Sequence, residues 1–183
     1  MNKIESGSIL ISDPFLKDPN FLRSVVLICE HHKDGTSGFI LNKKINKNIS
    51  EFIPEIEHVY FPVFYGGPVQ LDALHFIHTK PNIVEGGINV FEDVYWGGDF
   101  NQALEAIKQG TITPRDLRFY IGYSGWSLGQ LDAEVDQKGW ILYKANKSYL
   151  FHHNVEILWK EVLDEMGGEY KLIKNYPLDP QLN

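Results

Sequence analysis

Short apolar runs bounded by turn residues dominate the first half of the chain. Residues 9–11 and 25–29 are apolar and rich in β-branched side chains, which is typical of buried strands. The second run is followed by the polar stretch 30–35, which ends in an Asp34-Gly35 pair of the kind common in hairpin turns. We therefore expect residues 38–41 to form the return strand of a β-hairpin.

Apolar runs that stop at glycine or proline predict the remaining strands. Residues 63–65 run into Gly66-Gly67-Pro68, which cannot continue a β-ladder. Residues 42–62 are mixed in character, and within them we expect only a short helix at 49–53, limited by Pro54. By the same pattern the other predicted strands are 74–78, 88–91, 94–96, 117–121 and 140–143.

Capping residues place two helices in the second half of the chain. Asp99 and Gln102 have the spacing of a capping box, and an apolar helical face follows them. Ser127 and Gln130 repeat that spacing and predict a second helix, which runs to about Asp136.

The end of the sequence combines a helix with a proline-containing segment. Asn154 is the predicted N-cap of a final helix, which Gly167-Gly168 ends. After Tyr170 the sequence contains two prolines, so we expect an arm or a frayed end there. Because no linker, charge block or low-complexity tract divides the rest, we expect one domain over residues 1–170 and a C-terminal arm over residues 171–183.

Composition and charge narrow the classes of function. The 183 residues are 43% hydrophobic and 22% charged, as in globular proteins. The 17 basic and 24 acidic side chains give a net charge of −7. Non-specific nucleic-acid binding depends on basic side chains that neutralise phosphates, so it fits this charge poorly. Lys43, Lys44 and Lys47 form one local positive cluster, but acidic residues soon follow it and a solvated surface is the simpler interpretation.

Targeting signals and cysteine content favour a cytoplasmic protein without a membrane contact. The first residues lack the apolar core of a secretory signal, and the run 25–29 is far short of the ~20 residues of a membrane helix. Cys29 is the only cysteine, which excludes an intramolecular disulfide and a cysteine-rich zinc module. Since it ends an apolar run, we expect an inert buried thiol rather than a nucleophile.

The segment from Gly122 to Leu131 is the most distinctive local motif. With a strand predicted before it and a helix after it, its free backbone N–H groups and the helix dipole would suit an anion. It has neither the glycine spacing of a dinucleotide site nor that of a P-loop. Trp126 stands where a hydrolase elbow needs glycine, which argues against Ser124 as a nucleophile. We interpret the segment as a tight strand-to-helix turn covered by Trp126, and anion binding remains the alternative.

The histidines do not have the spacing of a metal site. His75 and His78 are three residues apart, so in a strand they point to opposite faces. Cys29 and His31 supply only two ligands, and we therefore predict no bound metal. The Glu30-His31 pair could act as a general base, but no nucleophile is assigned to it, and a hydrogen-bonding pair at a strand end is an equal alternative.

A series of short motifs, in a fixed order along nearly the whole chain, resembles the YqgE/AlgH family of bacterial proteins. Each motif is weak alone, and their order and spacing together are specific. The motifs are Gly7-Ser8-Ile9-Leu10-Ile11-Ser12-Asp13-Pro14, Asp18-Pro19-Asn20-Phe21, Arg23-Ser24-Val25-Val26, Cys29-Glu30-His31, Gly38-Phe39-Ile40-Leu41-Asn42, Gly66-Gly67-Pro68-Val69, Gly122 to Leu131, Trp140, Trp159 and Gly167.

The resemblance implies a fold but no reaction. It implies a single-domain α+β protein whose strongly bent, bifurcated mixed β-sheet forms a pseudo-barrel with helices outside. The family is often labelled a transcriptional regulator, and it supplies no agreed active site, so no catalytic residue and no cofactor can be carried over. Ser124 stands where the family usually has alanine, and Asp132 where it usually has glutamate. The first departure further weakens a nucleophilic role for Ser124.

Three functions are consistent with these observations. We favour a non-enzymatic regulatory protein that interacts with an unidentified protein partner. The alternatives are a small-molecule or anion-binding protein, or an enzyme, that uses the Gly122–Gln130 turn, and a direct DNA-binding regulator, which the net charge of −7 disfavours. The candidate binding residues are Glu30, His31, Asn42, Gly66, Gly67, Pro68, Gly122, Gly125, Trp126, Gly129 and Gln130.

Overall fold

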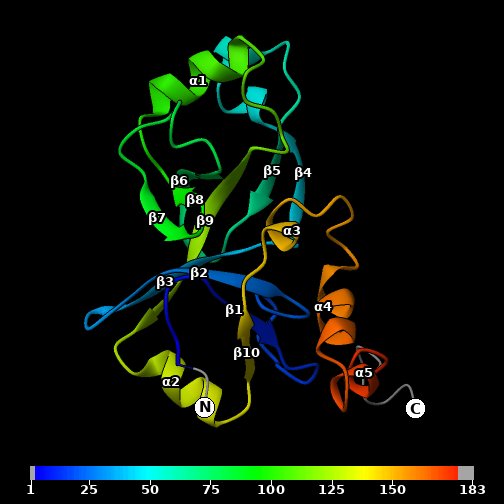
Figure 1. Ribbon diagram of the computed structural model, residues 1–183. Helices are drawn as coiled ribbons and strands as arrows, with labels where there is room; N and C mark the ends of the chain where they lie inside the picture. Colours follow the sequence, from blue (N-terminus) through cyan, green and yellow to red (C-terminus); the bar gives the residue numbers. More distant parts are fainter. Residues whose placement is uncertain (1–2, 177–183) are drawn as a thin grey trace.

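The strand-forming runs assemble into one large β-sheet with helices packed on its faces (Figure 1). The computed structural model describes residues 3–176. Within them the strands are β1 (Ser8–Ser12), β2 (Val25–His32), β3 (Gly35–Ile40), β4 (Lys44–Asn48), β5 (Pro62–Tyr65), β6 (Val69–His78), β7 (Ile88–Phe91), β8 (Val94–Trp96), β9 (Leu117–Ser127) and β10 (Trp140–Lys144). The helices are η1 (Ile49–Glu51), η2 (Pro54–Ile56), α1 (Phe100–Lys108), α2 (Gln130–Asp136), α3 (Lys147–Leu150), α4 (Leu158–Met166) and α5 (Tyr170–Ile173), of which η1 and η2 are 3-10 helices.

The sheet forks along the long strand β9. The carboxyl-terminal half of β9 pairs antiparallel with β3, where Gly38 lies opposite Ser124. Its amino-terminal half pairs on the same edge with β5, in parallel, at residues 119–121. The other edge of β9 pairs with β6. Two strands therefore share one edge of β9, and the sheet divides at the point where β9 exchanges one partner for the other.

The strand order confirms the α+β fold expected from the sequence. Along the main path the order is β10-β1-β2-β3-β9-β6-β8-β7, and β5 and β4 branch from β9. The β5–β9 pair is parallel and the other described pairs are antiparallel, so the sheet is mixed. Figure 1 shows β2 and β3 crossing the molecule while β5, β6 and β9 rise above them. The sheet is bifurcated and strongly bent, yet it stays open between its β10 and β7 ends.

Both faces of β1 and β2 are covered, which explains why these segments are continuous apolar runs rather than alternating ones. Ile9 and Ile11 face one apolar cluster, which α4 closes with the buried Trp159. Leu10 faces a second cluster on the side of α2. The indole N–H of Trp159 donates to the Ser12 C=O at 3.0 Å, so α4 is also held to the end of β1. A third cluster lies below α1 at the other end of the molecule (Figure 1).

One charged side chain is buried close to the fork. The Arg118 guanidinium, on β9, donates at 3.3 Å to the C=O groups of Leu41 and His152. It also lies 4.1 Å from the centre of the Phe64 ring. A buried guanidinium needs such acceptors and an aromatic face because burial removes its hydration. Arg118 thereby ties β9 to the end of β3 and to the segment that precedes α4.

The two strands of the β2–β3 hairpin extend further into its polar end than the sequence indicates. We expected residues 30–35 to be the connection, whereas β2 runs to His32 and only Lys33 and Asp34 separate it from β3. The hairpin itself is confirmed, and its register places Glu30 opposite Ser37. The polar composition here reflects strands that extend beyond the core into solvent, where apolar side chains are not required.

The prediction that a strand ends at Gly122 is wrong. β9 continues through Gly122 to Ser127, since Gly122 adopts a φ of +64° that bends the strand without ending it. The helix α2 then begins at Gln130 with Gly129 as its N-cap, so Ser127 is not the cap. Half of the expected capping box remains, because the Ser127 N–H donates to the Gln130 side-chain oxygen at 3.0 Å.

Other helix ends were predicted with mixed success. The Asp99 carboxylate accepts from the Gln102 N–H at 3.0 Å, as an N-cap should, but the Gln102 side chain accepts from the Glu85 N–H instead of closing a capping box. Asn154 is not a cap, because α4 begins at Leu158 after a turn. Asn146 instead caps the unpredicted short helix α3 through the Ser148 N–H. The expected helix at 49–53 is the 3-10 helix η1, and strand β4 was missed.

The predicted C-terminal arm is described only in part. Residues 171–173 belong to α5, and the description continues to Tyr176. Residues 177–183 lie outside the described residues.

Replacing Gly122 should destabilise the fold more than replacing Gly129. Both glycines have a positive φ, +64° and +70°, but a Cβ at Gly122 would lie 2.5 Å from the Gly67 carbonyl oxygen, whereas a Cβ at Gly129 would contact nothing within 4 Å. We expect Gly129→Ala to lower the free energy of unfolding by about 1 kcal/mol, the cost of the backbone conformation. Gly122→Ala should lower it by about 3 kcal/mol or more, since backbone must also move. Urea denaturation followed by tryptophan fluorescence measures both, and equal losses would contradict the close approach.

Candidate functional site

An open hollow lies between the β2–β3 hairpin and the carboxyl-terminal half of β9. We call it the acidic hollow. Its volume is about 430 Å³. The hairpin contributes Glu30, His32 and Asp34 to its lining, and β9 contributes Tyr123, Gly125 and Trp126. Three of the candidate binding residues predicted from the sequence, Glu30, Gly125 and Trp126, therefore lie in one concave surface.

The register between β3 and β9 builds this hollow. Ser37 lies opposite Gly125, and Thr36 opposite Trp126. Gly125 is exposed and has no side chain, which leaves the space above β9 open. A Cβ at Gly125 would contact the Tyr123 ring at 3.2 Å and a Val69 methyl at 3.6 Å, so those two side chains border the gap. Any larger side chain at this position would extend into the hollow.

Carboxylates give the hollow a negative charge. Glu30 Oε1 lies 3.7 Å from His32 Nε2, and Glu30 Oε2 accepts from the Ser37 hydroxyl at 3.4 Å. Asp34 is exposed at the hairpin turn. No lysine or arginine belongs to the lining among the described residues. Such a surface attracts a cation and opposes an anion.

Two predicted site residues on the hairpin side are engaged in structural hydrogen bonds instead. Nδ1 of His31 lies 2.7 Å from the Thr36 hydroxyl oxygen. The Asn42 amide donates to the Arg23 C=O at 2.8 Å, and its oxygen accepts from the Val25 N–H at 2.9 Å. Asn42 thereby fixes the start of β2 against the end of β3. Neither His31 nor Asn42 lines the acidic hollow.

Glycines at the fork allow two backbones to approach closely. A Cβ at Gly66 would lie 2.2 Å from the Gly122 carbonyl oxygen, and one at Gly67 would lie 2.4 Å from the Ser124 nitrogen. The Gly66 C=O accepts from the buried Ser124 hydroxyl at 2.9 Å. Pro68 is exposed and immediately precedes Val69, which lines the hollow. Gly66, Gly67 and Gly122 thus position the wall of the hollow without contacting its interior.

A carboxylate that the sequence did not single out fixes the tryptophan beneath the hollow. Glu134 Oε2 accepts from the indole N–H groups of both Trp126, at 2.9 Å, and Trp140, at 2.8 Å. Its other oxygen accepts from the Gln130 amide at 3.0 Å. The two indole rings meet edge to face at 5.9 Å, and Phe21 packs on both. Gln130 therefore acts on Trp126 through Glu134.

The sequence contained a signal for Glu134. Buried tryptophans need an acceptor for the indole N–H, and Gln130 and Glu134 are spaced i, i+4 on a helix. The lining residues His32, Asp34 and Tyr123 were also missed. Asp34 was interpreted only as part of a turn, and His32 as part of a loop. Their place in a site depends on the β3–β9 register, which local patterns do not reveal.

Two histidines of β6 have lowered pKa values. The His75 ring packs against Tyr123, Phe39 and Trp96, and burial lowers the pKa of His75. Burial also lowers the pKa of His78, whose Nδ1 accepts from the Lys80 N–H at 3.1 Å and whose Nε2 lies 3.0 Å from the Gly97 C=O. The two contacts of His78 require a neutral ring with its proton on Nε2. His78 is therefore neutral in this arrangement.

Cys29 is buried in the core, as the sequence indicates. Burial raises the pKa of its thiol well above the usual value, and the neighbouring Glu30 carboxylate adds to the effect. The thiolate that a nucleophile or metal ligand requires is therefore disfavoured. In the part of the chain that the structure describes, no three His, Cys, Asp or Glu side chains come together as a metal ion would require.

Comparison with known proteins decides the family. A model of the AlgH-like family matches residues 9–171. The chain belongs to the AlgH-like family. A UPF0301 protein of Cytophaga hutchinsonii is 41% identical over 181 residues, which cover 98% of this chain and 100% of that protein. A UPF0301 protein of Chlorobium phaeobacteroides is 38% identical over 181 residues, covering 99% of this chain and 97% of the relative.

Solved structures share the fold of this AlgH-like protein. A protein from Corynebacterium diphtheriae matches with a TM-score of 0.80 and 22% identity, covering 96% of this chain and 94% of the other. The AlgH protein from Pseudomonas aeruginosa matches with a TM-score of 0.74 and 24% identity, covering 97% and 98%. These likenesses confirm the fold that the motif order indicated, and they assign no molecular function. Of the helices described, none has the length and apolar character to cross a membrane.

Removing the shared acceptor of the two tryptophans should destabilise the AlgH-like protein. Glu134→Ala leaves two indole N–H groups without a partner, so we expect the free energy of unfolding to fall by about 2–4 kcal/mol. Glu134→Gln keeps a carbonyl oxygen that can accept both bonds and should lose about 1 kcal/mol or less. Urea denaturation followed by fluorescence measures both variants. Equal losses would mean that the charge of Glu134, rather than its role as acceptor, holds Trp126.

Two histidines of β6, the half-buried His75 and the buried His78, should make stability fall in mild acid. Both have a pKa below the unfolded value of 6.5, so their stabilising contribution is complete above that pH. As the pH falls below about 6.5, the unfolded chain takes up protons that the folded protein does not, and stability decreases towards the folded pKa. His75→Phe should reduce the loss of stability between about pH 7.5 and 5.5, because it removes one of the two shifted histidines.

A matched control separates this effect from general titration. His58 is exposed, with 91% of its side chain accessible, so His58→Phe is the control for removing an imidazole from the surface. An identical pH dependence in the wild type and in His75→Phe would show that His75 does not couple folding to protons.

Proposed function

We propose that this AlgH-like protein is a non-enzymatic regulatory protein that binds a basic segment of a protein partner in the acidic hollow. The observation that carries the proposal is the arrangement of Glu30, His32 and Asp34 around a concave surface on β9. No lysine or arginine offsets these groups in the described lining. In this proposal the protein acts in the cytosol. Its regulatory effect follows from binding the partner protein.

The chemistry of the lining favours a cation with an aliphatic stem. Glu30 and Asp34 provide carboxylate oxygens for a guanidinium or ammonium group. Tyr123 and Val69 line the same hollow and offer apolar surface to the methylene groups of a long side chain. An aromatic ring close to a cation adds a further attraction. Arginine and lysine combine these features, and at about 430 Å³ the hollow can hold more than one such side chain.

The same charges argue against the alternatives that use phosphate. A phosphate approaching the hollow would meet the Glu30 and Asp34 carboxylates, and the whole chain carries a net charge of −7. The Gly122–Gln130 segment was attractive for an anion because it was expected to be a turn with free N–H groups. In the structure residues 124–127 are paired with β3, which supports a role in shaping the hollow instead.

The candidate residues divide into two roles under this proposal. Glu30, Gly125 and Trp126 line the hollow, joined by His32, Asp34 and Tyr123. The remaining candidates support it from outside: His31, Asn42, Gly66, Gly67, Pro68, Gly122, Gly129 and Gln130. The second group should therefore affect binding only as far as it affects folding.

Removing the two carboxylates should weaken binding of a cationic peptide. The probe is a short fluorescein-labelled peptide of alternating glycine and arginine, and fluorescence anisotropy measures its affinity. The double variant Glu30→Gln with Asp34→Asn should bind about three- to tenfold more weakly, because each exposed ion pair contributes modestly. The affinity of the wild type should also fall as salt is added. Gly125→Leu should reduce binding without a change of charge, since its side chain would occupy the hollow.

Matched controls keep this test specific. Glu55→Gln with Glu57→Gln removes the same charge from exposed positions on and beside η2, far in sequence from the hollow, and should leave the affinity unchanged within about twofold. An equal loss in this control would mean that the peptide senses only the net charge, and the proposal would fail. A peptide of alternating glycine and glutamate should not bind, and spermidine as competitor distinguishes a free polyamine from a protein segment.

A further inference from the structure

Among the described residues, the strand β10 forms one end of the sheet and pairs on one side only. It pairs antiparallel with β1, from Ser8 opposite Lys144 to Ser12 opposite Trp140, without a register shift. The Ala145 N–H donates to the Gly7 C=O at 3.1 Å, and the Asp13 N–H donates to the Gly139 C=O at 3.0 Å. These two bonds bracket the ladder and fix its phase, because hydrogen-bonded pairs alternate along an antiparallel ladder.

The phase leaves a regular set of backbone groups on the outer edge. Residues 139, 141, 143 and 145 direct their N–H and C=O groups to β1, so Trp140, Leu142 and Lys144 direct theirs away from the sheet. Among the described residues, no hydrogen bond engages the backbone of Trp140, Leu142 or Lys144. Three donors and three acceptors therefore alternate along about 13 Å of the edge.

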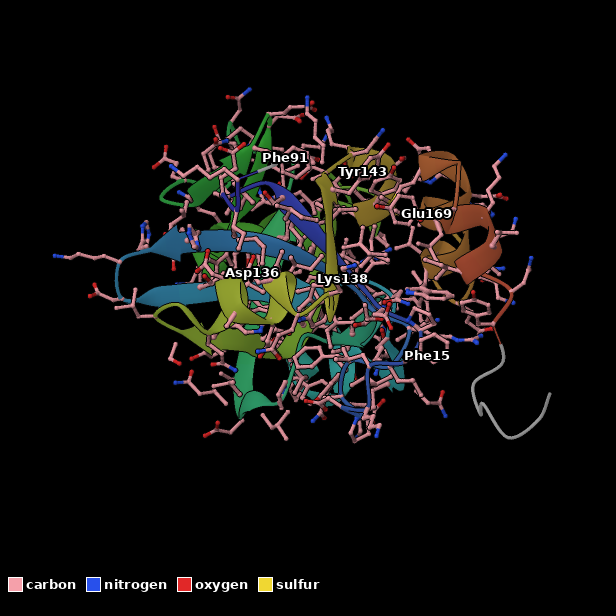
Figure 2. The ribbon with its side chains drawn as sticks, turned by 90° about the horizontal axis from the view of Figure 1, so that it is seen from below. Phe15, Phe91, Asp136, Lys138, Tyr143 and Glu169 are labelled. Atoms are coloured by element: carbon pink, nitrogen blue, oxygen red, sulfur yellow. The ribbon has the colours of Figure 1, made fainter. Side chains whose placement is uncertain are left out.

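Two hollows follow this edge and meet at its centre. The first has a volume of about 430 Å³ and lies between α2 and α5, with Lys138, Leu142, Tyr170 and Ile173 in its lining. The second, of about 370 Å³, lies beyond it towards the β7–β8 turn, with Phe91, Leu142 and Tyr143 in its lining. Figure 2 shows Lys138 and Tyr143 towards the two ends of β10, with Glu169 to one side and Phe91 near the Tyr143 end.

We infer that the open edge of β10 binds an extended segment of a protein partner by β-strand addition. An unpaired strand edge is complementary to one type of occupant, a second extended backbone with the same alternation of donors and acceptors. Alternate side chains of an added strand point to opposite faces of the sheet. The two hollows provide space for these side chains. The apolar groups of Leu142, Tyr143 and Ile173 select apolar residues at alternate positions.

This site differs from the acidic hollow in place and in chemistry. Its linings share no residue with that of the acidic hollow, and they carry both signs of charge, including Lys3 and Glu92 in one hollow and Lys138 and Glu169 in the other. Affinity here comes from backbone hydrogen bonds and apolar contact, so it should depend only weakly on salt. The inference does not rest on the proposed binding of a basic segment and can hold when that proposal fails.

A proline at the edge tests the inference through the backbone alone. The Lys144 N–H faces outwards, so Lys144→Pro removes a donor of the open edge without removing a bond to β1. Lys144→Ala loses the same charge and keeps the N–H, which makes it the matched control. The probe is a phage-displayed library of linear decapeptides, selected on the full-length wild-type protein. We expect enriched peptides with apolar residues at alternate positions, whose affinity is at least about tenfold lower for Lys144→Pro and within about twofold for Lys144→Ala.

Methylation of the peptide backbone provides the second measurement. N-methylation of the selected peptide at every second residue should abolish binding, and at the intervening residues it should change affinity by less than about threefold, since only alternate N–H groups of an added strand face β10. The thermal midpoint and the far-ultraviolet circular dichroism of each variant show whether the protein is folded.

Three results would overturn the inference. The first is equal enrichment of peptides on wild type and a folded Lys144→Pro, and the second is the absence of any alternation in the methylation series. The third is a wild-type dimer in analytical ultracentrifugation that Lys144→Pro converts to monomer, because the edge would then be occupied by a second copy of this chain.

Discussion

β9 can exchange one partner for another only because two backbones come into contact at the fork without side chains between them. The carbonyl of Gly122 faces Gly66, and the carbonyl of Gly67 faces Gly122, at distances that leave no room for a Cβ on either side. The Gly66 C=O accepts from the Ile40 N–H and the Gly66 N–H donates to the Ile121 C=O, so β3, β5 and β9 are joined at this one residue. This close approach lies where β9 changes its partner from β5 to β3.

The acidic hollow is a consequence of the same fork. Once β5 has left the edge of β9, that edge is free to pair with β3, and the β2–β3 hairpin extends past the core into solvent. Polar residues can occupy such a projection at no cost in core packing, and this is where Glu30, His32 and Asp34 lie. The glycines of the sequence motifs therefore have an architectural role, and the charged residues beside them present the chemistry. Trp126 belongs to one of these motifs and also lines the hollow, and its indole N–H donates to Glu134.

Sequence patterns predicted most of the strands and the local β2–β3 pairing, but they did not predict the pairings between distant strands. The strands at 9–11 and 25–29 were predicted correctly because both of their faces are covered. The Asp99 cap was predicted correctly because that interaction is local. The continuation of β9 beyond Gly122 was missed because a positive φ at glycine bends a strand as readily as it ends one. The acidic hollow could not be foreseen, since it needs the β3–β9 register, and Asn42 and His31 were singled out although their bonds are structural.

The bond from Trp159 to the Ser12 carbonyl joins residues 147 positions apart in the chain. The first strand, β1, also takes one of its two neighbours, β10, from the far end of the sequence. During synthesis the amino-terminal segment must therefore wait, with its apolar faces uncovered, until nearly the whole chain has left the ribosome. Such long-range closure slows folding and exposes nascent chains to aggregation and to chaperones. For this architecture, the time between the synthesis of β1 and that of α4 is the period of greatest vulnerability.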